Sequence, residues 1–180
     1  MSTKKYELTE ETVIFQRTTL HRIKALRNFG NVKKGDLGGF IKGEQCLSHE
    51  GNAWVADNAR VSGNAIISGN AIVCDDAIVY GRAKVSDNTK ISGEAVVYGN
   101  AKIYDKADLS GSVSVSGNAR VSGNARIYDE AMVHDDAEVC DDAVVAGEAK
   151  VYGNAKLHGD DMLFGRGRAC GDILTRYRYR

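Results

Sequence analysis

The sequence predicts an all-β protein: a parallel β-helix of about seven triangular coils, wound from hexapeptide repeats and capped at both ends. First, residues 53–178 repeat every six positions without an insertion or deletion. Second, the first 18 hexapeptides have Ala at position one in 16 cases, an aliphatic residue at position three in all 18, and Gly or Asp at position five in all 18. Third, the 180 residues include no proline, so every strand can donate hydrogen bonds to its neighbours. Such a short and strict period is typical of a solenoid.

Each hexapeptide reads as one short strand followed by one corner. Positions one and three are apolar and alternate with polar or variable positions two and four, which is the pattern of a strand with one buried face. Positions five and six carry Gly-Asn, Asp-Asn, Asp-Asp or Gly-Glu, and these residues tolerate left-handed backbone conformations. Three strands and three corners make an 18-residue coil, so residues 18 apart should stack in one column.

Both ends of the repeat depart from the pattern. We assign residues 1–40 to an N-terminal cap, in which alternation over Thr12–Phe15 and Leu20–Leu26 predicts a β-hairpin with its turn near Gln16–Thr19. The segment Ile41–Leu47 is a degenerate repeat, so we assign residues 41–178 to the solenoid. Residues 161–180 form a degenerate final coil and a basic C-terminal cap. Caps are expected because the last coils would otherwise expose their core and strand edges.

Runs such as VSGNAR, VYGNAK and IYDEAM resemble the hexapeptide motif of left-handed parallel β-helices. That superfamily includes trimeric acyltransferases and γ-class carbonic anhydrases. The stretches LHRIKALRNFGNVKKGDLGGFI and LSHEGNAWV resemble the N-terminal cap of YdcK-like and phage-encoded hexapeptide-repeat proteins, which are often labelled transferases. The resemblance implies left-handed winding and a homotrimer. It is specific for the fold and says little about chemistry.

Outward residues can be assigned to three faces from the 18-residue register. One face is a charged, solvated wall, whereas another gathers apolar and aromatic side chains. Exposed patches of this kind usually mark interfaces. We interpret this patch as a subunit interface, with ordinary strand composition and a ligand groove as the alternatives. Its members are Ile78, Tyr80, Val96, Tyr98, Met132, His134 and Tyr152.

Catalytic and metal chemistry find little support in the residues. Acyltransferases of the superfamily place a histidine in a cleft between subunits, often beside a loop that leaves the coil, and no such loop interrupts this register. His134, near Lys150 and Tyr152, is the candidate general base if the chain is a transferase. Zinc is not expected, because His134 and His158 lie 24 residues apart, whereas the carbonic anhydrases need three histidines, two of them five apart. Calcium is not expected either, since acidic pairs at three corners of one coil point apart.

The carboxyl end is rich in arginine interleaved with tyrosine. This pattern could bind phosphate, RNA or an acidic protein, or it could cap the last coil with charged side chains, which is the interpretation we favour. The arginines are Arg166, Arg168, Arg176, Arg178 and Arg180.

Bulk composition limits the remaining possibilities. Lys plus Arg and Asp plus Glu are 24 each, so no global field attracts nucleic acid or membranes. No apolar run is long enough to span a membrane and no signal peptide is evident, from which we expect a cytoplasmic protein without membrane contact. The four cysteines lack metal-type spacing, and we interpret them as reduced thiols.

Two functions follow from these observations. We expect a non-catalytic binding or assembly module: a rigid oligomer, most simply a trimer, that presents flat faces to an unidentified protein partner, with phage–host interaction as one setting. No cofactor is expected. The alternative is an acyltransferase that uses acetyl-CoA at a site between subunits.

Overall fold

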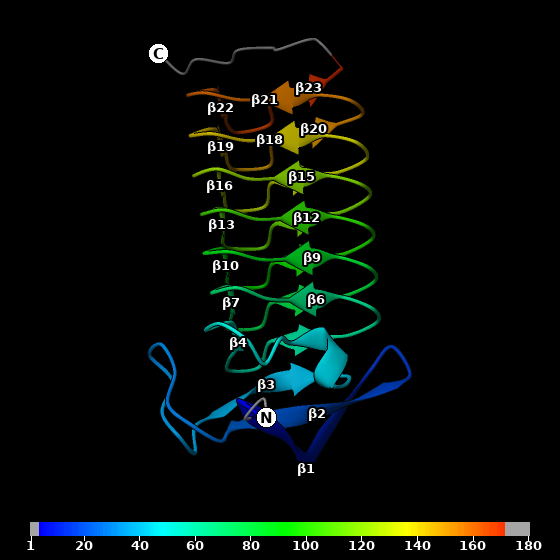
Figure 1. Ribbon diagram of the computed structural model, residues 1–180. Helices are drawn as coiled ribbons and strands as arrows, with labels where there is room; N and C mark the ends of the chain where they lie inside the picture. Colours follow the sequence, from blue (N-terminus) through cyan, green and yellow to red (C-terminus); the bar gives the residue numbers. More distant parts are fainter. Residues whose placement is uncertain (1–3, 172–180) are drawn as a thin grey trace.

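The computed structural model describes residues 4–171, and it is an all-β parallel solenoid with a different, antiparallel element at its N-terminal end (Figure 1). The only helix among the described residues is the short 3-10 helix η1 (Glu44–Cys46). Seven triangular coils rise along one axis, as the hexapeptide period predicts.

Three sheets form the walls of the solenoid. Sheet A has ten strands, sheet B has seven and sheet C has six. Sheet A runs β1 (Tyr6–Phe15), β2 (Thr18–Ala25), β3 (Leu37–Ile41), β5 (Arg60–Val61), β8 (Ile78–Val79), β11 (Val96–Val97), β14 (Ser114–Val115), β17 (Met132–Val133), β20 (Lys150–Tyr152), β23 (Arg168–Cys170). Sheet B runs β4 (Trp54–Val55), β7 (Ile72–Val73), β10 (Lys90–Ile91), β13 (Asp108–Leu109), β16 (Arg126–Ile127), β19 (Val144–Val145), β22 (Met162–Leu163). Sheet C runs β6 (Ile66–Ile67), β9 (Lys84–Val85), β12 (Lys102–Ile103), β15 (Arg120–Val121), β18 (Glu138–Val139), β21 (Lys156–Leu157).

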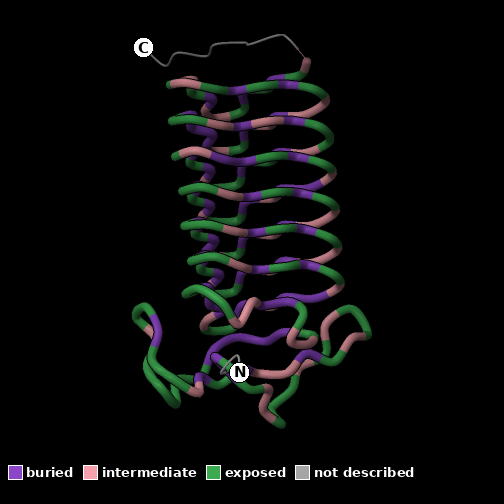
Figure 2. The backbone as a smooth tube through the Cα atoms, in the orientation of Figure 1, coloured by how far each residue is buried: buried purple, intermediate pink, exposed green. Residues whose placement is uncertain are grey.

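The register between coils is 18 residues in all three sheets, which confirms the predicted columns. Ile78 pairs with Val96 in sheet A, for example, and every coil-to-coil pairing is parallel. Backbone N–H groups donate to the carbonyl 17 residues ahead, as from Arg60 to Ala77 at 2.9 Å. The interior is continuous along the axis because positions one and three point inward in every coil (Figure 2).

The corners depend on a left-handed backbone conformation at position five. From Asp57 to Gly171 every position-five residue has a positive φ, between 53° and 83°. Gly adopts this conformation without steric cost, and Asp is among the few other residues that visit it readily. The Asp residues contribute further, because their carboxylates accept the backbone N–H of the coil above. Asp75, for example, accepts the Gly93 N–H at 2.8 Å.

The N-terminal segment is an antiparallel hairpin that continues sheet A beyond the solenoid. β1 and β2 pair across a two-residue turn at Gln16 and Arg17, and β3 then pairs parallel with β5. β1 starts at Tyr6, six residues before the alternation that predicts it, and its pairing is irregular between Leu8 and Thr12. This early part of the strand does not alternate cleanly, which is why its sequence pattern is weak. The irregular pairing and the glutamates of β1 discourage further pairing along its free edge.

Lys5 and Tyr6 close the N-terminal end of the core. In the regular coils a carbonyl accepts the N–H of the residue 17 positions earlier, but the Asp36 N–H donates to Lys33 instead of to Ala53. The Lys5 Nζ donates to the Ala53 carbonyl at 2.8 Å and so takes the place of the missing strand. The Lys5 side chain is fully buried, 5.0 Å from the centroid of the Phe29 ring.

Inward and outward positions of one strand should respond very differently to the same substitution. Val97 is fully buried, and Val97→Asp would bury an unpaired carboxylate, so we expect it to lower the free energy of unfolding by roughly 3 kcal/mol or more. Its neighbour Val96 points outward, and Val96→Asp should cost less than about 1 kcal/mol. Urea denaturation followed by circular dichroism measures both. Equal losses in the two variants would contradict the inward–outward assignment.

The buried lysine makes a testable contribution to stability as a function of pH. Burial, with repulsion from Arg27 as the smaller cause, lowers the pKa of Lys5 from 10.5 to about 8. Between these two values the unfolded chain binds more protons than the folded chain, so the contribution of this group to stability increases as the pH rises from 8 to 10.5. Neutral Lys5 keeps an N–H for the Ala53 carbonyl.

We therefore expect the wild type to gain stability over Lys5→Met across this pH range, when urea midpoints are compared at pH 7.5, 9 and 10.5. Lys34→Met, at an exposed position, is the matched control. A difference between wild type and Lys5→Met that does not change with pH would show that Lys5 is as well solvated in the folded protein as in the unfolded chain.

Candidate functional site

The outer surface of sheet A carries the predicted apolar patch, here called the aromatic face and defined by Ile78, Tyr80, Val96, Tyr98, Met132, His134 and Tyr152. The register places all seven on this sheet or at the corners that follow its strands. The rings of Tyr80 and Tyr98, one coil apart, are stacked with centroids 5.1 Å apart and planes 4° apart. Offset or edge contacts between rings stabilise such pairs beyond their area. Most members are half-buried, and Met132 is 39% exposed.

Phe15 extends this face, and the sequence pattern does not reveal it. It lies at the end of β1 and makes an edge contact with Tyr80, with ring centroids 6.0 Å apart. The next residue back, Ile14, is the most exposed large apolar residue described, at 81%. Phe15 belongs to the hairpin and not to the repeat, so its position depends on how the cap continues sheet A. The row of rings Phe15, Tyr80 and Tyr98 therefore joins the cap to the solenoid.

A second ring pair lies further along the same sheet. His134 stacks on Tyr152 with centroids 5.4 Å apart, and its Nδ1 lies 3.1 Å from the Asp135 Oδ2. The same Asp135 oxygen accepts the Gly153 N–H at 3.1 Å. That backbone hydrogen bond first, and His134 second, lower the pKa of Asp135. Lys150 lies in sheet A beside Met132, on the strand that leads to Tyr152.

This arrangement is the geometry of an oriented imidazole. A carboxylate beside Nδ1 fixes the ring, and Nε2 has no partner among residues 4–171. A histidine held in this way can act as a general base. The structure thus brings together His134 and Tyr152 of the predicted set and adds Asp135, a sequence neighbour whose role depends on its corner conformation.

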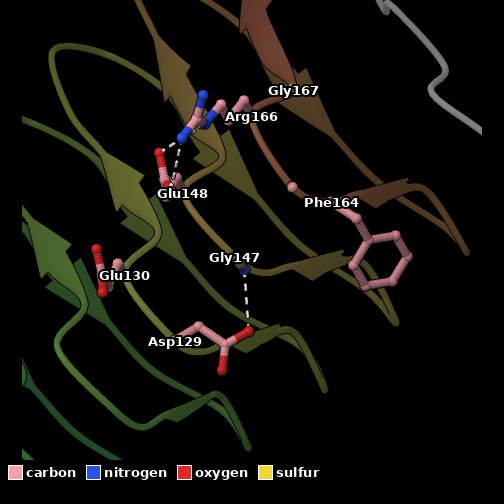
Figure 3. A pocket seen from close by; sticks show the side chains of 8 residues that line it. Asp129, Glu130, Gly147, Glu148, Phe164, Arg166 and Gly167 are labelled. Carbon is pink, nitrogen blue, oxygen red and sulfur yellow. Dashed lines mark hydrogen bonds and ion pairs between the residues drawn. The ribbon is translucent and has the colours of Figure 1, made fainter.

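An open cleft of about 680 Å³ lies elsewhere, at the corners that lead from sheet B to sheet A (Figure 3). Glu130 and Glu148 lie to one side of Gly147 and the Phe164 ring to the other. Arg166 donates to Glu148 at 3.0 Å, and Asp129 accepts the Gly147 N–H at 3.0 Å. No histidine lines this cleft, so it is separate from the His134 pair.

The acidic corners are occupied by structural hydrogen bonds. In the fifth coil Asp129, Asp135 and Asp141 each accept a backbone N–H from the coil above. One group of three possible metal ligands occurs among residues 4–171, formed by Asp57, Cys74 and Asp75. Burial, followed by the charge of Asp75, raises the pKa of the Cys74 thiol to about 11, which disfavours the thiolate that binds metal.

The remaining predicted residues are spread out. Cys74, Cys140 and Cys170 follow strands of sheets B, C and A and are unpaired, as their register predicts. Arg166 is engaged with Glu148, and Arg168 lies in β23. Arg176, Arg178 and Arg180 lie outside the described residues. No helix within residues 4–171 could cross a membrane.

Comparison with known proteins identifies the repeat. A search of curated proteins finds no match to the chain. A family model described as YdcK Beta solenoid repeat matches residues 59–75, which cover β5, β6 and β7. Together with the seven-coil parallel solenoid, this match fits a YdcK-like repeat protein.

Proposed function

We propose that this protein is a non-catalytic binding and assembly module that associates with copies of itself through the aromatic face. The observation that carries the proposal is the row of rings Phe15, Tyr80 and Tyr98, flanked by Ile78 and Val96, on a flat sheet. Half-buried aromatic and branched side chains on a rigid surface are the usual core of a protein interface.

The regularity of the coils supports this proposal. From residue 53 to residue 171 a strand begins every six residues, so no loop leaves the solenoid there to enclose a substrate. Flat sheet surfaces suit contact with another protein better than they suit enclosure of a small molecule. A homotrimer and a phage–host setting rest on the resemblance to hexapeptide-repeat proteins. The module needs no cofactor.

Removal of the apolar side chains should dissociate the oligomer. We expect the quadruple variant Ile78→Ser, Tyr80→Lys, Val96→Thr, Tyr98→Lys to give a smaller particle in light scattering at micromolar concentration, because the area that drives association is lost. Its circular dichroism should match the wild type, since all four side chains point outward.

The matched control is Ile72→Ser, Tyr128→Lys on sheet B, which removes apolar side chains from another face and should leave the particle size unchanged. A wild type that is already monomeric at this concentration would rule out self-association. Loss of the oligomer in both variants would show that the aromatic face is not the specific contact.

A second candidate function is acyl transfer from acetyl-CoA, and the His134 geometry supports it. Nδ1 faces the Asp135 carboxylate, and Tyr152 packs on the ring, which would leave Nε2 to accept the proton of an acceptor hydroxyl or amine. Lys150 lies on the same strand as Tyr152 and could contact an anionic part of the donor. The superfamily resemblance points in the same direction.

These two functions differ in one cheap measurement. We expect calorimetry to detect no saturable binding of acetyl-CoA to the wild type, and assays to detect no acetyl-CoA hydrolysis or transfer. Saturable binding would reverse the order of the two proposals. In that case His134→Ala should lower turnover by roughly 100-fold without loss of stability, whereas His158→Ala, on sheet C, should leave turnover unchanged.

A further inference from the structure

Sheet C carries three cations directly above one another on its outer face. Lys84 on β9 pairs with Lys102 on β12, and Lys102 pairs with Arg120 on β15. All three side chains are exposed, and consecutive strands lie about 4.8 Å apart. We call this set the cationic ladder.

Stacking like charges in register is unfavourable, and the rest of the solenoid avoids it. Like charges directly opposite each other on neighbouring strands destabilise a sheet. Sheet B alternates its charges at the same level, from Lys90 to Asp108 to Arg126. Further along sheet C, Glu138 binds Lys156 at 3.3 Å. The ladder has no such compensation, because none of its three cations makes an ion pair with any residue between 4 and 171.

The corners beside the ladder add positive charge. Arg82 lies at the corner before β9 and Lys106 at the corner after β12, and both are exposed. The acids at these corners are Asp87 and Asp105, and each carboxylate accepts a backbone N–H from the next coil. The local field over the three strands is therefore positive although the whole chain has a net charge of zero.

A row of hydroxyl groups runs beside the cations. Ser86, Tyr104 and Ser122 each follow a ladder cation by two residues, which places them on the same side of the sheet. Tyr104 is the single aromatic residue in this row. A single-stranded nucleic acid bound here would need one ring for each stacked base, which this face does not provide. Cations, hydroxyls and one ring on a flat surface instead match the acid groups, hydroxyls and ring faces of a sugar polymer.

We propose that sheet C binds an extended acidic polysaccharide that runs parallel to the solenoid axis. Lys84, Lys102 and Arg120 would contact successive carboxylates or sulfates, and the hydroxyl row would bond the sugar hydroxyls. This surface lies on a different wall from the aromatic face, so it stays accessible when copies associate through sheet A. The binding is distinct from self-association and does not depend on it.

The test uses labelled oligosaccharides and fluorescence anisotropy at 50 mM and 200 mM NaCl. An oligogalacturonate presents carboxylates, a heparin oligosaccharide presents sulfates, and a dextran of similar length is uncharged. A 20-nucleotide oligo-dT serves as the nucleic acid probe. We expect the wild type to bind at least one acidic sugar, more weakly at the higher salt, and not to bind dextran. Comparison of the two acidic sugars identifies whether carboxylate or sulfate is preferred.

The ladder variant is Lys84→Gln, Lys102→Gln, Arg120→Gln, and we expect it to lose about 10-fold or more in affinity for the acidic sugar. Its melting temperature should equal or exceed that of the wild type because like-charge repulsion is removed. The control variant Lys33→Gln, Lys90→Gln, Arg126→Gln removes the same charge elsewhere and should keep its affinity within about threefold.

Three results would overturn the proposal. The first is a wild type that binds neither acidic sugar at 50 mM NaCl. The second is an equal loss of affinity in the ladder and control variants, which would mean non-specific attraction. The third is ladder-dependent binding of oligo-dT that is tighter than binding of the sugars, which would assign the face to nucleic acid.

Discussion

The structure depends on a left-handed backbone turn at every corner, because this turn brings each coil into register with the next. Successive corners lie so close that a Cβ built on Gly117 would be 2.7 Å from the backbone nitrogen of Asp135. Only residues that accept a positive φ can occupy position five, and here they are Gly and Asp. Where Asp is used, its carboxylate adds a bond to the coil above. The same residues that suggest a metal site by composition are thus part of the frame.

Once the corners fix the register, the three outer faces can differ freely in chemistry. The interior repeats Ala and a branched residue in nearly every rung, so outward positions carry little of the packing energy. Sheet A gathers rings, sheet C gathers cations and sheet B alternates charges. Each face is one side chain wide per strand and repeats at the strand spacing. The solenoid therefore holds separate surfaces at fixed positions relative to one another.

Sequence reasoning reached the features that depend on the period and missed those that do not. The coils, the inward positions and the columns on each face follow from counting in sixes. The contact of Phe15 with Tyr80 and the bond from Lys5 to Ala53 do not, because both join a non-repeating cap to the first coils. The cleft at Glu130 and Glu148 also escaped, since it depends on side-chain size at successive corners. The approach of Asp135 to His134 was within reach, because the two are adjacent in the chain.

The 18-residue register makes chain length a discrete variable with two very different units. Loss or gain of 18 residues within the solenoid would shorten or lengthen the prism by about 4.8 Å and return every later side chain to its own wall. Loss or gain of six would leave the backbone bonds equally satisfied but rotate the whole remainder by one wall. The rings of His134 and Tyr152, for instance, would then no longer lie in line with those of Tyr80 and Tyr98. Recombination in steps of one coil could thus adjust the reach of this scaffold, whereas steps of one strand would exchange the surfaces that its two halves present.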